Sequence, residues 1–120
     1  MSAFLQSGRQ PLILASSSKV RARLLEAAGL AFIVEPPGLD EHAMRQAVSG
    51  TGALSPQDVA EVLARAKAEA VSELARDAFV IGADQVLALG DRILSKPESM
   101  EAARGALLDL SGTSHTLHSA

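Results

Sequence analysis

The residues best suited to chemistry lie around three serines at 16–18 and the basic residues that follow them. An apolar run at 12–15 leads into the serines, and Lys19 and Arg21 fall in the first turn of a predicted helix over 18–28. A helix N-terminus carries partial positive charge, so cations there are unfavourable unless an anion binds at the same end. Backbone N–H groups, serine hydroxyls and arginine can together hold a phosphate. The segment predicts a phosphate site, and the alternative is a solvated basic helix capped by a serine.

Asp84 is the second candidate, because it ends an apolar strand that begins at Phe79 and passes through Gly82 and Ala83. Small residues ahead of a carboxylate let backbone or a ligand come close, and in open α/β sheets ligands bind beyond the carboxyl ends of strands. A carboxylate at that place could bind a divalent metal or activate water. The alternative is an aspartate that starts a turn.

Other charged residues could complete such sites. Glu41 could add a carboxylate for Mg²⁺, since hard cations take oxygen ligands and share them with substrate phosphates. Lys67 borders the apolar stripe of a helix predicted over 55–76, and Lys96 is held extended by Pro97. Taken singly, Glu41 also fits a polar loop and each lysine a solvated surface. The three histidines lack metal-ligand spacing, so no zinc site is predicted.

Strands and helices alternate along the chain, which predicts an α/β fold. Gly29 is expected to end the first helix, Ser55 and Pro56 to begin the second, and Gly90 to form a hairpin turn. A loop is expected to begin at 39–42, and 43–54 has no clear pattern. The predicted strands are 12–15, 32–34, 79–84, 85–89, 92–94 and 115–119, and the predicted helices are 18–28, 55–76 and 99–110.

Composition narrows the class of protein. A net charge of −3 and an aromatic fraction of 2% argue against a nucleic-acid partner. The absence of cysteine removes disulfides, thiol catalysis and cysteine-based zinc sites. No segment reaches the ~18 apolar residues of a membrane helix, and the first ten residues lack an apolar core of signal-peptide length. We therefore expect a soluble, cytoplasmic protein with no membrane partner.

Several short motifs follow one another in a specific order from Leu12 to about His115. They are Leu-Ile-Leu-Ala-Ser-Ser-Ser at 12–18 with Arg21, Leu24-Leu25 with Gly29, Asp40-Glu41, Ala66-Lys67-Ala68, Gly82-Ala83-Asp84, Lys96-Pro97 and Leu110-Ser111-Gly112. In this order and spacing they resemble the Maf family of nucleotide pyrophosphatases. The resemblance implies a mixed twisted sheet with flanking helices and a cleft between two lobes, as in inosine triphosphate pyrophosphatases. It also implies hydrolysis of a nucleoside triphosphate to the monophosphate and pyrophosphate, assisted by Mg²⁺ or Mn²⁺.

Carried over by position, the resemblance implies a role for each candidate residue. Asp84 would be the catalytic carboxylate, as general base or through the metal, and would bind the metal together with Glu41. The implied phosphate-binding residues are Ser16, Ser18, Arg21, Lys67 and Lys96. Val20 and Gln85 would be specificity positions, and Gln85 favours the branch acting on 7-methylguanosine triphosphate over the branch acting on dTTP and UTP. The polyphosphate is expected to bridge the serine turn and Asp84.

The sequence departs from the family pattern at a few places. Ser18-Lys19-Val20-Arg21 stands where many members have Ser-Pro-Arg-Arg, and Thr113 stands where many have arginine. Family members also continue well past Ala120, so residues 1–120 are expected to form one Maf-like domain without its C-terminal portion. Such a piece could be inactive alone or act as a homodimer. Two rival functions stay open, a nucleotide-binding regulatory module of division or septum control that does not hydrolyse, and another triphosphate pyrophosphatase class.

Overall fold

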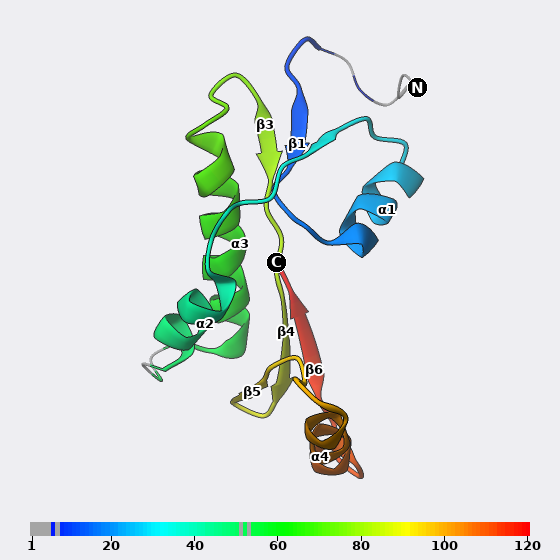
Figure 1. The fold of residues 1–120 in the computed structure, drawn as a ribbon, viewed down its shortest axis with the longest axis vertical. Helices are drawn as coiled ribbons and strands as arrows, with labels where there is room; N and C mark the ends of the chain where they lie inside the picture. Colours follow the sequence, from blue (N-terminus) through cyan, green and yellow to red (C-terminus); the bar gives the residue numbers. More distant parts are fainter. Residues whose placement is uncertain (1–5, 7, 51, 53) are drawn as a thin grey trace. The chain divides into compact units, whose positions relative to one another are not determined.

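The computed structural model describes residues 6, 8–50, 52 and 54–120. The chain divides into two compact units, which we call unit 1 (Met1–Asp40 and Ala64–Ala83) and unit 2 (Glu41–Leu63 and Asp84–Ala120). The elements shown in Figure 1 are β1 (Leu12–Leu14), α1 (Lys19–Ala27), β2 (Ile33–Val34), α2 (Glu41–Ser49), α3 (Pro56–Ser72), β3 (Phe79–Ile81), β4 (Gln85–Leu89), β5 (Arg92–Leu94), α4 (Met100–Leu110) and β6 (Thr116–Ser119). Helices and strands mix as the sequence predicts, and the α/β fold class is confirmed.

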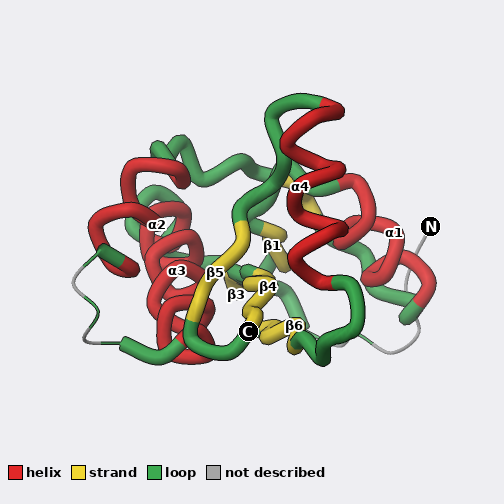
Figure 2. Tube along the Cα trace, turned by 90° about the horizontal axis from the view of Figure 1, so that it is seen from below, coloured by secondary structure: helices red, strands yellow, loops and turns green. Residues whose placement is uncertain are grey.

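Unit 1 contains a parallel sheet in the order β2-β1-β3. Ile13 of β1 pairs with Ile33 on one side and Val80 on the other. Parallel neighbours need a crossover connection, and α1 supplies the one from β1 to β2. In the views of Figures 1 and 2, α1 and α3 lie on opposite sides of this sheet. Ile13, Ala15 and Val71 form its buried core, and apolar burial of this kind is the main favourable term in folding.

Helix α1 begins and ends as its sequence predicts. Ser18 is the N-cap, and its side chain accepts a hydrogen bond from the backbone N–H of Arg21. At the other end Gly29 has a φ of +82°, a conformation that glycine adopts without a Cβ clash. The first turn of α1 contains no acidic residue, so no carboxylate of the helix itself offsets its basic residues there.

Unit 2 contains an antiparallel sheet in the order β5-β4-β6. The predicted hairpin joins β4 and β5, and Gly90 in its turn has a φ of +61°. Val86 of β4 is fully buried and packs with Val59, Ala60 and Leu63 from the first half of α3. The sheet of unit 2 therefore depends on the same helix that contributes its second half to unit 1.

Helix α2 corrects the expected loop at 39–42, because the helix already begins at Glu41 and runs to Ser49. Its apolar residues Met44 and Val48 lie four positions apart and pack against the buried core of unit 2. That spacing places both side chains on one helix face. The pattern was detectable, but it covers little more than one turn and two glycines follow it closely.

Helix α3 is shorter than predicted, since it ends at Ser72 rather than near residue 76. Leu74, four positions beyond Ala70 at helical spacing, is 87% exposed. After Ser72 the chain turns, and the backbone N–H of Leu74 donates to the carbonyl of Val71, three residues back. The tighter turn moves Leu74 off the buried stripe of the helix.

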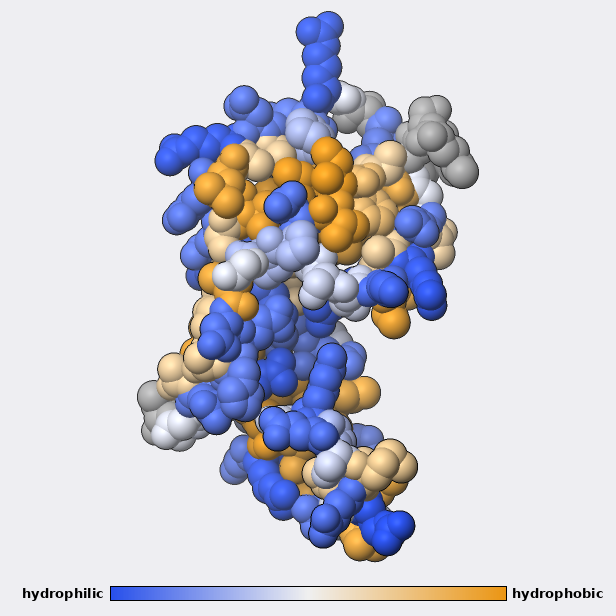
Figure 3. Space-filling model, viewed as in Figure 1, coloured by the Kyte–Doolittle hydropathy of each residue, from blue (hydrophilic) through white to orange (hydrophobic). Residues whose placement is uncertain are grey.

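Apolar side chains gather on the face of unit 1 that Figure 3 shows. The outer strands β2 and β3 leave Ile33, Val34 and Phe79 exposed by 56%, 44% and 62%. Within the described part of the chain, no helix has the length and apolar character needed to cross a membrane.

Candidate functional site

The prediction that Asp84 ends a strand over 79–84 is wrong, because β3 stops at Ile81. Asp84 instead lies in unit 2, immediately before β4, where backbone pairing fixes its position. Its N–H donates to the carbonyl of Ala120 at 2.9 Å, and its own carbonyl accepts from the N–H of Ala120 at 2.9 Å. The residue is 3% exposed, and Val86, on the same face of the strand two positions later, is fully buried. A carboxylate is thus held at the buried end of a strand, and the turn-starting alternative does not explain that burial.

Arg45 of α2 contacts this carboxylate and was missed by the sequence reasoning. Its Nη2 lies 3.3 Å from Oδ1 and 3.4 Å from Oδ2 of Asp84. The side chains of Arg45 and Asp84 are 23% and 2% exposed. A buried carboxylate is stable only with hydrogen bonds or countercharge, and Arg45 supplies both. The sequence indicates a role for Arg45 only indirectly, because helix α2 must be recognised before Arg45 can be placed on it.

Glu41 is the first residue of α2 and is exposed. It lies four positions before Arg45, so the two side chains start from the same side of the helix. The predicted metal ligands Glu41 and Asp84 therefore both belong to unit 2, which also carries the arginine.

The donor set fits a divalent cation of the Mg²⁺ type. Among the described residues there is no group of three or more histidine, aspartate or glutamate side chains that could hold a metal. Mg²⁺ does not need such a cage, because it is commonly bound by one or two carboxylates plus water and substrate phosphates. The buried oxygens of Asp84 are ligands of this type, although Arg45 lies against both of them. Metal binding by Asp84 and Glu41 stays a prediction.

The serine turn in unit 1 brings together Ser16, Ser18 and Arg21, three of the predicted phosphate-binding residues. The hydroxyl oxygen of Ser16 accepts from the backbone N–H of Ser18 at 3.0 Å and from Nη1 of Arg21 at 3.4 Å. The hydroxyl of Ser18 accepts from the backbone N–H of Arg21 at 3.3 Å. Ser16 is 3% exposed, whereas Ser18 and Arg21 are partly exposed. The arginine is thus directed toward the N-terminus of its own helix, the end that favours anions.

Lys67 of α3 is buried in unit 1, which excludes the solvated-surface alternative for this lysine. It is 3% exposed, and its Nζ donates to the carbonyl of Ala83 at 3.3 Å. Gly82 makes this possible by lying against α3. A Cβ atom at Gly82 would lie 2.3 Å from the carbonyl oxygen of Ala64. Only glycine permits that approach of backbone to backbone.

The other predicted site residues are exposed. Lys96 follows β5 and is exposed, so its solvated alternative and its phosphate role both stay open. Val20 in α1 is 62% exposed. Gln85 opens β4, and its Nε2 donates to Oγ of Ser119 at 3.0 Å. Val20 belongs to unit 1 and Gln85 to unit 2, and their specificity roles stay predictions.

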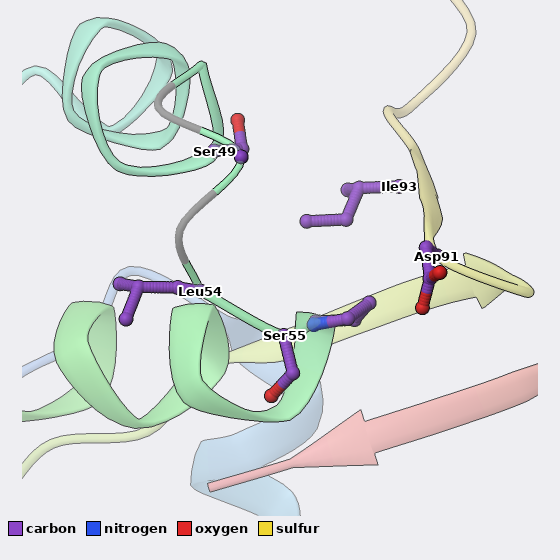
Figure 4. A pocket seen from close by; sticks show the side chains of 7 residues that line it. Ser49, Leu54, Ser55, Asp91 and Ile93 are labelled. Atoms are coloured by element: carbon purple, nitrogen blue, oxygen red, sulfur yellow. The ribbon is translucent and has the colours of Figure 1, made fainter.

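A cavity of about 540 Å³ in unit 2 is lined by other residues than these. Ser49, Leu54 and Ser55 line it from the end of α2 and the start of α3, and Asp91 and Ile93 line it from the β4–β5 hairpin (Figure 4). None of the predicted site residues is among its described lining residues. The cavity therefore gives no support to the predicted chemistry.

A family model and several curated proteins match this chain over most of its length. A family model described as "Maf-like protein" matches residues 11–120. A 7-methyl-GTP pyrophosphatase of Brucella abortus biovar 1 (strain 9-941) is 49% identical over 109 residues, which are 91% of this chain and 54% of the relative. A 7-methyl-GTP pyrophosphatase of Rhizobium meliloti (strain 1021) has the same identity and coverage. A nucleoside triphosphate pyrophosphatase of Rhodopseudomonas palustris (strain BisB18) is 46% identical over 113 residues, 94% of this chain and 54% of the relative. The chain spans about half the length of the curated relatives it matches.

Proposed function

Because the chain belongs to the Maf-like family, we propose that it hydrolyses a nucleoside triphosphate to the monophosphate and pyrophosphate. The observation that carries this proposal is the carboxylate of Asp84, which is 3% exposed and lies at the start of β4. A buried carboxylate contributes little to stability, since a well-packed apolar residue would do as well or better. Its burial immediately before β4 is what chemistry on a bound ligand would require, since charges act most strongly where water is excluded.

Asp84 acts on the water that attacks the α-phosphorus. In this reaction the bond from the α-phosphorus to the bridging oxygen breaks, and pyrophosphate leaves. The carboxylate accepts a proton from the water, and its fixed backbone pairing with Ala120 keeps the accepting oxygens in one place. A divalent cation, when bound, neutralises charge on the phosphate oxygens, and Asp84 and Glu41 are the residues that would hold it.

Four of the five phosphate contacts are assigned to residues of unit 1, and the fifth, Lys96, belongs to unit 2. Ser16 and Arg21 present a hydroxyl and a guanidinium at the start of α1, where backbone N–H groups also favour anions. Lys67 carries its charge in a buried position, where a cation interacts with an anion more strongly than it does in water. Ser18 and Lys96 complete the proposed phosphate set.

The favoured substrate is 7-methyl-GTP, with Val20 and Gln85 as specificity positions. Relatives carrying that name are 49% identical to the chain over 109 residues. The competing substrates dTTP and UTP belong in the same assay. Pyrophosphate release from 7-methyl-GTP at least ten times faster than from dTTP or UTP supports this choice, and the reverse order overturns it.

The test measures pyrophosphate release with Mg²⁺ or Mn²⁺ for the wild type, Asp84→Asn and Asp91→Asn. We expect Asp84→Asn to lose turnover by about a thousandfold or more, in keeping with the loss of one essential group. Asp91 is exposed in the β4–β5 turn, so Asp91→Asn makes the same chemical change without touching the site. The Brucella abortus protein serves as the positive control for the assay.

Two results would overturn hydrolysis by Asp84. Equal turnover of the wild type and Asp84→Asn removes the assigned base. Nucleotide binding by both proteins without any pyrophosphate release favours the alternative of a regulatory module that binds nucleotide without cleaving it.

A further inference from the structure

The contact between Arg45 and Asp84 is loose for an ion pair. A single nitrogen, Nη2, lies 3.3 and 3.4 Å from the two carboxylate oxygens. Charge-assisted N–H···O bonds are commonly about 2.7–2.9 Å long, and arginine holds a carboxylate most firmly with two parallel bonds from two donor nitrogens. Here one donor nitrogen is shared between both oxygens, so another ligand of the carboxylate can replace the guanidinium at low cost.

The two side chains differ in their access to solvent. The carboxylate is 2% exposed, whereas the side chain of Arg45 is 23% exposed. Arg45 can therefore withdraw toward water, and Asp84 cannot. Water compensates the guanidinium when it leaves, whereas the oxygens of Asp84 that it contacts stay buried and favour a cation in its place.

Helix α2 fixes where Arg45 starts from. Met44 and Val48 anchor the helix in the core of unit 2. The Oγ of Ser49 donates a hydrogen bond to the carbonyl oxygen of Arg45. Glu41 lies one turn earlier on the same side of the helix as Arg45. The arginine thus lies on the helix face that carries one predicted cation ligand, while its side chain contacts the other.

From these observations we propose that Arg45 is a positioning residue that holds the Asp84 carboxylate until a divalent cation binds, and that it then releases at least one oxygen. The proposal rests on the proposed function, in which Asp84 and Glu41 bind the cation. Arg45 and the cation compete for the same two oxygens, and their like charges repel each other. Arg45 therefore lowers the affinity for the cation in the absence of nucleotide and keeps the carboxylate paired with a guanidinium until the cation takes its place.

The decisive measurement is the affinity for Mn²⁺ alone, read from the electron paramagnetic resonance of free Mn²⁺ during titration of the 120-residue chain. We expect Arg45→Gln to bind Mn²⁺ about tenfold more tightly than the wild type, the factor that corresponds to losing one net competing hydrogen bond. Damage to the fold would have the opposite effect and weaken binding. Arg92→Gln is the matched control, because Arg92 also pairs with an aspartate of unit 2, Asp109, but both side chains are well exposed. We expect its affinity for Mn²⁺ to equal that of the wild type.

Two further variants keep the test decisive. In an Asp84→Asn background, Arg45→Gln should no longer change Mn²⁺ affinity, since the shared carboxylate is gone. Arg45→Lys retains the charge for the case in which Arg45→Gln does not fold, and its single ammonium should raise Mn²⁺ affinity by about threefold. The proposal is overturned if neither Arg45 variant binds Mn²⁺ more tightly than the wild type, including the case in which none of them binds it.

This result is separate from the outcome for hydrolysis. Tighter Mn²⁺ binding by Arg45→Gln without pyrophosphate release from any variant supports the role of Arg45 and refutes the proposed reaction. Pyrophosphate release that depends on Asp84, together with unchanged Mn²⁺ affinity in the Arg45 variants, supports the proposed reaction and refutes the role of Arg45.

Discussion

Replacing Gly82 with alanine tests the close packing of the β3 end on α3. The new Cβ would lie 2.3 Å from the carbonyl oxygen of Ala64, 2.7 Å from the backbone nitrogen of Ala68 and 2.8 Å from its Cβ. The first two of these are backbone atoms of a helix, so no side-chain rotation relieves the clash. The segment must instead move away from α3 and take with it Ala83, whose carbonyl accepts the hydrogen bond from Lys67.

The expected loss of stability follows from two opposing terms. Overpacking of a filled interior costs about 1–3 kcal/mol, and contacts as short as these belong at the upper end. Gly82 has no positive φ, so alanine suits the backbone and recovers about 0.4–1 kcal/mol by restricting the unfolded chain. With a cost near 3 kcal/mol, we therefore expect Gly82→Ala to lower the free energy of unfolding by about 2–2.6 kcal/mol.

The assay is urea denaturation followed by far-ultraviolet circular dichroism, because the chain contains neither tryptophan nor tyrosine as a fluorescent probe. Gly105→Ala is the matched control. Gly105 lies inside α4, and a Cβ there would meet no atom within 4 Å. This control should be more stable than the wild type by roughly 0.5–1 kcal/mol, since glycine is a poor helix former. The close packing of Gly82 on α3 is refuted if Gly82→Ala is as stable as the wild type or more stable.

Two further substitutions test the core and the buried lysine. Val86→Ala should lower the free energy of unfolding by about 2 kcal/mol, because Val86 is fully buried in unit 2. Val62→Ala, at a 41% exposed position, should change it by less than about 0.5 kcal/mol. Equal losses in urea denaturation would contradict the assigned core. Lys67→Met should lower the free energy of unfolding by about 1–3 kcal/mol, because the carbonyl of Ala83 loses its donor, and should weaken binding of a nucleoside triphosphate at least tenfold in calorimetry. Arg65→Met, an exposed charge on the same helix, should leave binding unchanged, and unaltered binding by Lys67→Met would remove that lysine from the phosphate set.

The fold was predictable wherever local chemistry decides it. Ser18 and Gly29 delimit α1, and Gly90 sets the hairpin, because caps and turns depend on residues close in sequence. Helix α2 was missed for the opposite reason. Its formation depends on Met44 and Val48 packing against residues of α3 and β4, so tertiary contacts rather than local propensity stabilise it.

In the candidate site, too, the contacts set by local sequence were predictable and those set by tertiary packing were not. Ser16 and Arg21 lie within one turn-and-helix segment, so their contact follows from local structure. Arg45 and Asp84 are 39 positions apart, and their pairing requires α2 to be anchored and β4 to be paired with β6. Nothing in the sequence near Asp84 indicates a partner on α2. Contacts between distant elements of this kind cannot be derived from spacing alone.

The distribution of buried polar groups is the strongest physical argument for function. Within the described part of the chain, the buried polar or charged residues are Ser16, Lys67 and Asp84. Burying a charge is expensive, and a packed apolar side chain would stabilise the fold at least as well. Each of the three was also singled out from the sequence, by its place in a motif rather than by its burial. The proposed chemistry on an anionic substrate would account for their burial, since charges act most strongly where water is excluded.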